Sequence, residues 1–331
     1  MPLKLMSITI IKAGLFTTVQ DAGRKGFQHL GINPSGAMDA LAMQIANVLI
    51  QNKSDEAVIE FFYPAPTIHF NTAAFIALSG ADFGATINDI PVPTNHPIFV
   101  PENAVLSFTK KISGHIAYLA IQGGLELNEW MNSYSTNTRA GAGGIEGRIL
   151  IKGDQLYLKA AATQENKESP LQVLPWMADT KGLYQTQSLR YLPGNEFGLL
   201  NMVSQQFMTN AQFTLNADSD RMGYRLKGPE LKCKKTIELI SSGVTNGTIQ
   251  LLPNGQCIVL LADHQTTGGY PRIGHIIQSD IPTLVQQSPG STIRLIPVNM
   301  ETAEKINNRH SQYLQQLKNA CTLQLNAYHR H

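Results

Sequence analysis

A stretch of the sequence, ADHQTTGGYPRIG at positions 262–274, gathers hydrogen-bonding side chains around two adjacent glycines. His264 has an unperturbed pKa near neutral pH, which makes it the candidate for proton transfer. Arg272 is a candidate for stabilising negative charge that develops on a substrate oxygen. Around them stand groups that can orient a substrate, and glycines that let it approach the backbone: Gln265, Thr266, Thr267, Gly268, Gly269 and Tyr270. These residue types predict a substrate site.

The same stretch follows two predicted strands, TIQLL (248–252) and CIVLLA (257–262), which a Pro-Asn-Gly turn joins into a hairpin. Groups at the end of a strand are held by a rigid sheet while they face a cleft. His264 has no second histidine or cysteine at ligand spacing, so we predict no metal site. The sequence also lacks the GxSxG elbow of a serine nucleophile.

A second polar region, TTVQDAGRKGFQHLGINPSGAMD (17–39), contains four glycines that permit close approach of a ligand. We expect Gln20 and Asp21 to orient the substrate, and Arg24 to stabilise charge. A helix predicted to begin after Ser35 would offer free N–H groups to an anion. The alternative is an elaborate turn in which Arg24 pairs with Asp21 for structural reasons.

Two further polar regions interrupt the strand pattern. In residues 133–154, Arg139 and Arg148 bracket a glycine-rich segment that includes Gly143 and Gly144, which predicts a site for a carboxylate or phosphate; a mobile surface loop is the alternative. No P-loop or dinucleotide fingerprint is present. Residues 216–229, NADSDRMGYRLKGP, are interpreted as a solvated charged turn. Aspartates at alternating positions are also found in calcium sites, but the glycine and the closing glutamate do not have EF-hand spacing, so we predict no metal there.

Short segments rich in β-branched residues predict a mainly β fold. The predicted strands are SITII (7–11), TIHF (67–70), AAFIAL (73–78), VLSFT (105–109), HIAYLAI (115–121), QLYLKA (155–160), TIELI (236–240), TIQLL, CIVLLA and TIRLIPV (292–298). Helices are expected after Ser35, over FGLLNMVSQQF (197–207), and over residues 301–320 at the C-terminus. Helices do not alternate with strands, which excludes a regular βαβ fold.

Composition narrows the classes of protein. The 331 residues are 43% hydrophobic and have a net charge of +2, which favours a globular chain with no general attraction to nucleic acid or membranes. Cys233, Cys257 and Cys321 lack disulfide or metal spacing, so we expect reduced thiols. The N-terminal apolar run is interpreted as a strand, and no segment has the length of a membrane span, so we expect a cytoplasmic protein.

Six motifs together resemble the biotin-dependent carboxyltransferase family: FTTVQDAGRKGFQHLGINPSGAMD, LSGADF, YLAIQGGL, RAGAGGIEGRILIKGD, SDRMGYRLKG and GTIQLLPNGQCIVLLADHQTTGGYPRIG. The resemblance runs in order from about residue 8 to residue 297. It implies two cyclophilin-like β-barrel domains with a few helices and an active-site cleft between them. The expected limits are 1–160 and 188–300, with a linker at 161–187 and a C-terminal helix and tail at 301–331.

The family's functions concern small amides. One branch moves CO2 from carboxybiotin to urea, and the other opens 5-oxoproline to glutamate with ATP. A chain of this length resembles the proteins of the second branch. In that branch the resemblance implies two partners, a kinase-inhibitor-like protein and a protein of the lactam-utilisation type. We therefore expect one component of a multi-subunit enzyme, inactive alone and without covalent biotin, with ATP used by the complex.

Three alternatives stay open. Carboxyl transfer to urea or a similar amide would use carboxybiotin supplied by another polypeptide. A regulatory protein that sequesters a kinase-inhibitor-like partner would need the glycines and donors but no titrating group. A hydrolase with a serine or cysteine nucleophile is the third alternative, and covalent labelling would identify it.

Overall fold

The computed structural model describes residues 6–159, 170–184, 188–235 and 239–328. Contacts divide the chain into two compact units. Unit 1 contains Met1–Gly23, Asp39–Asp179 and Gln312–His331, and unit 2 contains Arg24–Met38 and Thr180–Ser311. The segment Arg24–Met38 therefore belongs with the unit built from the second half of the sequence. The domain limits expected from the sequence stay a prediction.

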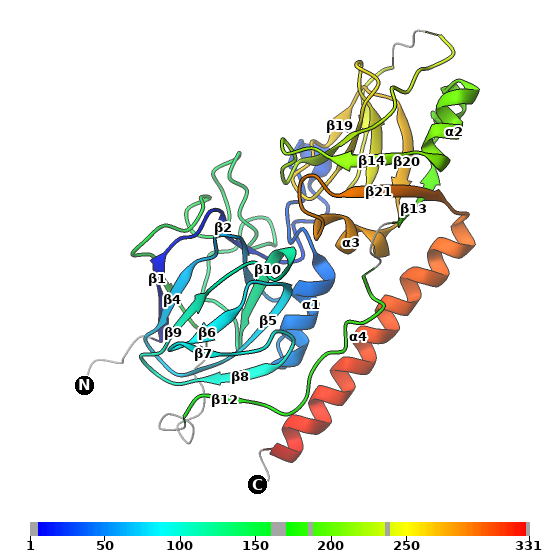
Figure 1. Cartoon of the computed structure of the whole chain (residues 1–331). Helices are drawn as coiled ribbons and strands as arrows, with labels where there is room; N and C mark the ends of the chain where they lie inside the picture. The colour runs from blue at the N-terminus through cyan, green and yellow to red at the C-terminus, as the bar shows by residue number, and fades with distance from the viewer. Residues whose placement is uncertain (1–5, 160–169, 185–187, 236–238, 329–331) are drawn as a thin grey trace. The chain divides into compact units, whose positions relative to one another are not determined.

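Unit 1 holds two six-stranded sheets in the part that the structure describes (Figure 1). One sheet has the order β11 (Gln155–Tyr157), β1 (Ser7–Lys12), β4 (Thr67–Phe70), β9 (Val105–Phe108), β6 (Ala85–Ile87), β7 (Ile90–Pro91). The other has the order β12 (Gln172–Val173), β8 (Pro97–Val100), β5 (Ala74–Asp82), β10 (Ser113–Ile121), β3 (Val58–Phe62), β2 (Thr17–Gln20).

Both sheets contribute to one buried cluster, which contains Ile8 and Phe70 from the first sheet and Ile59 and Leu119 from the second. Side chains alternate between the faces of a strand, so the remaining residues of the second sheet face the other way. Helix α1 (Ala40–Leu49) packs on β5 and β10. The resemblance predicts a closed barrel for this half, whereas its described strands form two open sheets around a shared core.

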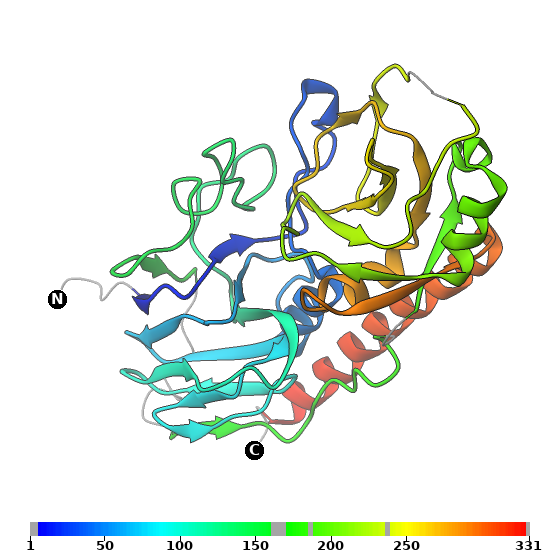
Figure 2. The ribbon, with the colours of Figure 1, turned by 45° about the horizontal axis from the view of Figure 1, so that its top comes forward.

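Unit 2 contains a closed barrel (Figure 2). Its strand order is β13 (Ser188–Pro193), β20 (Arg272–Ile276), β17 (Thr248–Leu251), β18 (Cys257–Leu260), β15 (Gly223–Lys227), β14 (Gln212–Leu215), β21 (Thr292–Pro297). A separate ribbon pairs β16 (Ser242–Gly243) with β19 (Thr267–Gly268). The unit also contains η1 (Gln28–Leu30), η3 (Phe197–Leu199), α2 (Met202–Asn210), η4 (Gln278–Asp280) and α3 (Ile281–Val285). Helix α4 (Met300–Tyr328) contributes its first residues to unit 2 and its later residues to unit 1.

The predicted mainly β architecture is confirmed, and so is the hairpin in which Leu251 of β17 pairs with Cys257 of β18. The expected strand at 236–240 lies mostly outside the described residues. The start of the first helix differs from the prediction: Asp39, not Ser35, is the N-cap, and its carboxylate accepts from the backbone N–H of Ala42 at 2.9 Å. Ser35 has φ 52°, a left-handed conformation that cannot begin this helix. No helix in the described ranges combines the length and apolarity of a membrane span.

Candidate functional site

His264 lies at the end of the β17–β18 hairpin and is fully buried. Its Nδ1 lies 2.5 Å from the carbonyl oxygen of Gln265. A carbonyl oxygen only accepts, so Nδ1 carries the proton and Nε2 is left as an acceptor. Nε2 is buried and has no hydrogen-bond partner among the described residues. Burial lowers the pKa of His264, against the opposing effects of the Gln265 carbonyl and of Asp263, so the ring is neutral near pH 7.

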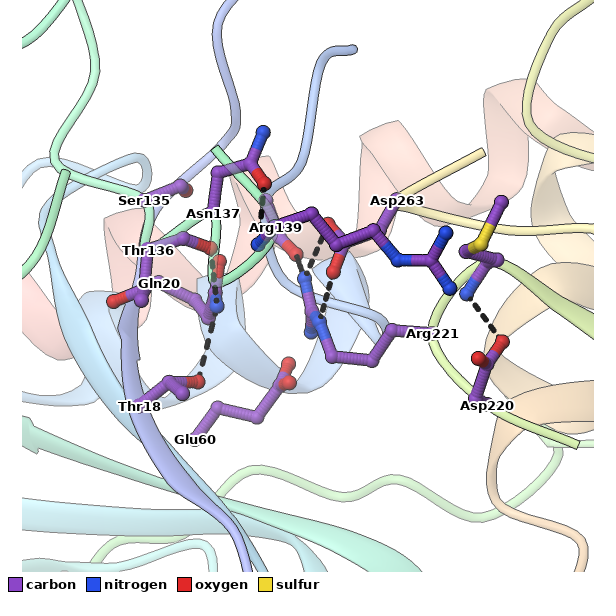
Figure 3. A network of polar contacts seen from close by, with 12 residues as sticks. Thr18, Gln20, Glu60, Ser135, Thr136, Asn137, Arg139, Asp220, Arg221 and Asp263 are labelled. Atoms are coloured by element: carbon purple, nitrogen blue, oxygen red, sulfur yellow. Dashed lines mark hydrogen bonds and ion pairs between the residues drawn. The ribbon is translucent and has the colours of Figure 1, made fainter. Parts of the chain in front are cut away.

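Asp263 fixes the backbone beside His264 through an ion pair with Arg221 (Figure 3). Arg221 donates from Nε to one carboxylate oxygen at 2.8 Å and from Nη2 to the other at 3.1 Å. The same Nη2 donates to the carbonyl oxygen of Gly36 at 2.7 Å, and the side chain of Asn33 donates to the carbonyl oxygen of Asp263 at 3.0 Å. These contacts attach the segment around residues 33–36 to the hairpin end.

The solvated-turn interpretation of residues 216–229 is wrong for Arg221, which is 7% exposed. Its neighbour Asp220 accepts from the backbone N–H of Met222 at 2.8 Å and orders the turn, as Figure 3 shows. The interpretation fits Asp218 and Arg225, which are exposed. The burial of Arg221 could have been suspected from the motif SDRMGYRLKG, because Arg221 stands just before the residues that form strand β15.

Arg272 forms a bidentate ion pair with Glu196, which immediately precedes η3. Its Nε and Nη2 donate to the two carboxylate oxygens at 3.0 and 2.7 Å, and its backbone N–H donates to the same carboxylate at 3.0 Å. The pair raises the pKa of Arg272 and lowers that of Glu196. The structure thus gives this guanidinium a structural partner, and its expected role toward a substrate stays a prediction.

The adjacent glycines of the opening stretch pack against the chain itself. A Cβ at Gly268 would lie 2.4 Å from Nε2 of Gln250, and one at Gly269 would lie 3.3 Å from Oγ of Ser241. Gln250 is buried on β17, and its Nε2 has no hydrogen-bond partner in the described part of the chain. Sequence reasoning missed it, although a single glutamine in the apolar run TIQLL is a usable signal. Of the other residues in the stretch, Gln265, Thr267 and Tyr270 are exposed and Thr266 is half-buried.

In unit 1, Gln20 ends β2 and is fully buried. Its Nε2 donates to Oγ1 of Thr18 at 3.0 Å and to the carbonyl oxygen of Thr136 at 3.3 Å (Figure 3). The Thr136 carbonyl can only accept, so this orientation of the amide is fixed. Oε1 of Gln20 is consequently an acceptor with no hydrogen-bond partner within the described ranges. Such an oxygen can accept an N–H from a ligand.

Asp21, the next residue, is a structural anchor in its own unit. Its carboxylate accepts from the Ser133 hydroxyl at 2.7 Å, the Ser135 hydroxyl at 2.5 Å, and the backbone N–H groups of Tyr134 and Gly23 at 2.6 and 2.8 Å. Three of these donors bind Oδ1 and one binds Oδ2, and the expected contact of Asp21 with a substrate stays a prediction. Arg24 follows in unit 2, fully buried, with its backbone N–H donating to the carbonyl oxygen of Pro34 at 2.7 Å.

A buried polar row crosses the second sheet of unit 1 and was not expected from the sequence. Thr18 lies opposite Glu60, Glu60 opposite Tyr118, and Tyr118 opposite Ser79 in the strand register. Tyr118 donates its hydroxyl to Glu60 at 2.8 Å and accepts from the backbone N–H of Asp39 at 2.7 Å. Burial, followed by the charges of Glu60 and Asp39, raises the pKa of Tyr118 well above its usual value. The single acid in the strand VIEFF is the sequence signal for this row.

The glycine-rich loop of the predicted anion site uses many of its donors internally. Arg148 pairs bidentately with Asp154 at 2.7 and 3.0 Å, which raises the pKa of Arg148 and lowers that of Asp154. The backbone N–H of Gly144 donates to the carbonyl oxygen of Tyr134, and Gly143 accepts from the N–H of Gly147. The side chain of Asn137 accepts from the backbone N–H of Arg139 at 3.2 Å (Figure 3). An anion in this loop stays a prediction.

The family model for the carboxyltransferase domain, subdomain A and B, matches residues 30–297. The chain belongs to this carboxyltransferase family. Over 310 residues it is 36% identical to the C subunit of 5-oxoprolinase from Escherichia coli K12, covering 94% of the chain and 97% of that protein. It is 35% identical to the C subunit of 5-oxoprolinase from Haemophilus influenzae over 311 residues, covering 94% and 97%.

Among solved structures, the chain is similar to the urea amidolyase of K. lactis, with a TM-score of 0.87 and 26% sequence identity. The match covers 96% of this chain and 20% of that protein. The chain therefore spans about one fifth of the length of this relative, whereas it matches the two bacterial proteins over nearly their whole length.

Proposed function

We propose that the chain is one component of an ATP-dependent 5-oxoprolinase complex that opens the lactam of 5-oxoproline to glutamate. The observation that carries the proposal is the match to the C subunit of 5-oxoprolinase at 36% identity over 94% of this chain and 97% of the relative. The match covers nearly the whole length of that relative, which supports the same role in a complex. Under this proposal the chain is part of an enzyme and is inactive alone.

The proposed partners are the kinase-inhibitor-like protein and the protein of the lactam-utilisation type, and the complex hydrolyses ATP. We assign no ATP contact to this chain. In the glycine-rich loop Arg148 is held by Asp154, and the N–H groups of Gly144 and Gly147 have backbone acceptors, so these groups give no support for an ATP phosphate there. The chain is proposed to carry no covalent biotin and to work in the cytoplasm.

For the site, we propose that His264 acts as the proton acceptor of the reaction. Its buried Nε2 acceptor, fixed by the Nδ1 contact to Gln265, supports this role. Arg24 is proposed to stabilise negative charge, and in unit 1 Oε1 of Gln20 is proposed to accept a hydrogen bond from a bound ligand. Arg272 is assigned to hold the strand end through Glu196, and Asp21 to hold the loop at residues 133–135. Cyclophilin-like domains are the finer fold that the family resemblance implies.

Carboxyl transfer from carboxybiotin to urea is the second candidate. It is favoured by the name of the matching family model and by the similarity to urea amidolyase. The chemistry of the site does not separate the two candidates, because a urea and a lactam both present a carbonyl oxygen beside an N–H.

Co-purification separates them. A tagged chain is expressed in its native host, and the bound proteins are identified by mass spectrometry. We expect the kinase-inhibitor-like and lactam-utilisation-type partners, and an intact mass without biotin on this chain. The recovered complex should then convert 5-oxoproline with ATP and leave urea unchanged. Recovery of a biotin-carboxylase partner, with turnover of urea, would establish the second candidate instead.

A further inference from the structure

Ser35 lies between two residues that are bonded to the ion pair beside His264. The side chain of Asn33 donates to the carbonyl oxygen of Asp263, and the carbonyl oxygen of Gly36 accepts from Nη2 of Arg221, which also binds the Asp263 carboxylate. His264 is the residue directly after Asp263. Two contacts, one on each side of Ser35, therefore bring it to the end of the hairpin that carries His264.

The backbone of Ser35 is held in an unfavourable conformation. Its φ is 52°, and φ of the following Gly36 is 98°. A serine rarely adopts a left-handed conformation, and such strain persists only where the surrounding contacts impose it. Here the bonds to Asn33 and Gly36 supply those contacts.

The hydroxyl of Ser35 is a buried polar group. The residue is 7% exposed, and its Oγ has no partner among the residues that the structure describes. A buried polar atom without a partner is costly, so each such atom needs an explanation, of which a bound ligand, ion or water is one. His264 Nε2 is a second such atom, and the residues that follow it, Gln265 and Thr267, are exposed. Ser35 and His264 thus each carry a buried hydrogen-bonding atom that is unpartnered among the described residues.

We propose that Ser35 is a specificity residue that binds the amide group of the substrate together with His264. The hydroxyl of Ser35 donates to the carbonyl oxygen, and Nε2 of His264 accepts the neighbouring N–H. A five-membered lactam holds its C=O and N–H on the same edge, so one donor and one acceptor can bind both groups at once. The choice of 5-oxoproline as the substrate rests on the proposed function. Ser35 is added to the substrate-binding residues, whereas the sequence suggested it only as a helix cap.

Two substitutions of Ser35 separate the hydroxyl from the backbone strain. Ser35→Ala removes the hydroxyl and keeps the strain, whereas Ser35→Gly removes the hydroxyl and relieves the strain. Loss of one neutral hydrogen bond to the bound substrate predicts a KM for 5-oxoproline about five- to tenfold higher in both variants, with little change in kcat. The matched control is Ser279→Ala, because Ser279 is 4% exposed and its Oγ is also unpartnered among the described residues, on η4.

The kinetic measurements use the reconstituted complex. A wild-type KM in Ser35→Gly would overturn the proposal, even if Ser35→Ala were impaired, because the backbone rather than the hydroxyl would then matter. A fall in affinity of the same size in Ser279→Ala would also overturn it. Absence of turnover in the wild-type complex would instead count against the proposed function.

A binding measurement tests the proposed roles of Ser35 and His264 independently of turnover. Nitrogen NMR of the histidine-labelled chain, in its complex, identifies Nε2 of His264 by its loss in His264→Gln. Added 5-oxoproline should shift this signal, and the N-methyl lactam, which lacks the N–H, should not. In Ser35→Gly the shift should require about five- to tenfold more 5-oxoproline. No shift in the wild-type protein, or an equal shift with the N-methyl compound, would contradict the proposal.

Discussion

Replacing Asp263 by alanine should destabilise unit 2 strongly. The carboxylate accepts two charge-assisted hydrogen bonds from Arg221, at 2.8 and 3.1 Å, and the two side chains are 12% and 8% exposed. Removing one member leaves a guanidinium charge inside the unit without this counter-ion, which costs about 3 kcal/mol or more. For a unit of this size, about 3 kcal/mol lowers the Tm by roughly 6–12 °C.

The control is Asp218→Ala, which removes the same charge from an exposed position of the neighbouring loop. It should change the free energy of unfolding by less than about 0.5 kcal/mol. Differential scanning calorimetry of both variants measures the difference in Tm. The double variant Arg221→Met/Asp263→Ala should have a higher Tm than Asp263→Ala, because it also removes the buried guanidinium charge that the single variant leaves without a counter-ion. Equal Tm values for Asp263→Ala and Asp218→Ala would refute the reasoning that the ion pair holds this part of the unit together.

Other predictions concern pH and the glycine-rich loop. The free energy of unfolding should fall as the pH drops below about 6.5, because burial lowers the folded-state pKa of His264 and the unfolded state then binds the proton first. Urea titrations from pH 8 to 5 should show a shallower decline for His264→Gln, and parallel curves would contradict this. Gly144→Ala should cost about 1–3 kcal/mol more than Gly141→Ala, since both have positive φ but only the Cβ at 144 meets Oγ1 of Thr136, at 2.0 Å. Thermal melts that rank the two variants equally would count against the described packing of the loop.

Local patterns in the sequence predicted the strands well, because alternating and β-branched residues determine a strand within a few positions. The strand TIHF coincides with β4, and the turn at Pro253 and Asn254 lies in the β17–β18 hairpin as expected. The first helix was placed too early because Ser35 is a good N-cap residue by type. The turn that holds Ser35 at φ 52° depends on the contact of Gly36 with Arg221 and of Asn33 with Asp263, which span 185 and 230 positions of the sequence.

The hydrogen-bond and ion-pair partners of the site residues could not be predicted, because they lie far away in the sequence. Arg272 pairs with Glu196, and Arg221 pairs with Asp263, across 76 and 42 positions of the sequence. Nothing near Asp21 indicates that its carboxylate binds the loop at 133–135. The sequence did identify the two polar stretches at 17–39 and 262–274. In each, an aspartate follows soon after a strand, Asp21 after β2 and Asp263 after β18, and its carboxylate anchors a loop.

Omitting and restoring this chain in a purified complex tests whether it is a necessary component of a 5-oxoprolinase. The kinase-inhibitor-like and lactam-utilisation-type partners are mixed with 5-oxoproline and ATP, and glutamate is measured with no added chain, with the wild-type chain, and with His264→Ala. Removing a general acid or base costs about 100-fold or more in rate. Glutamate should form with the wild-type chain and should not form when the chain is omitted. With His264→Ala the rate should fall by at least about that factor, while the variant still binds its partners and melts cooperatively. Equal rates with and without the wild-type chain would contradict the proposed function, and a wild-type rate with His264→Ala would remove His264 from the mechanism.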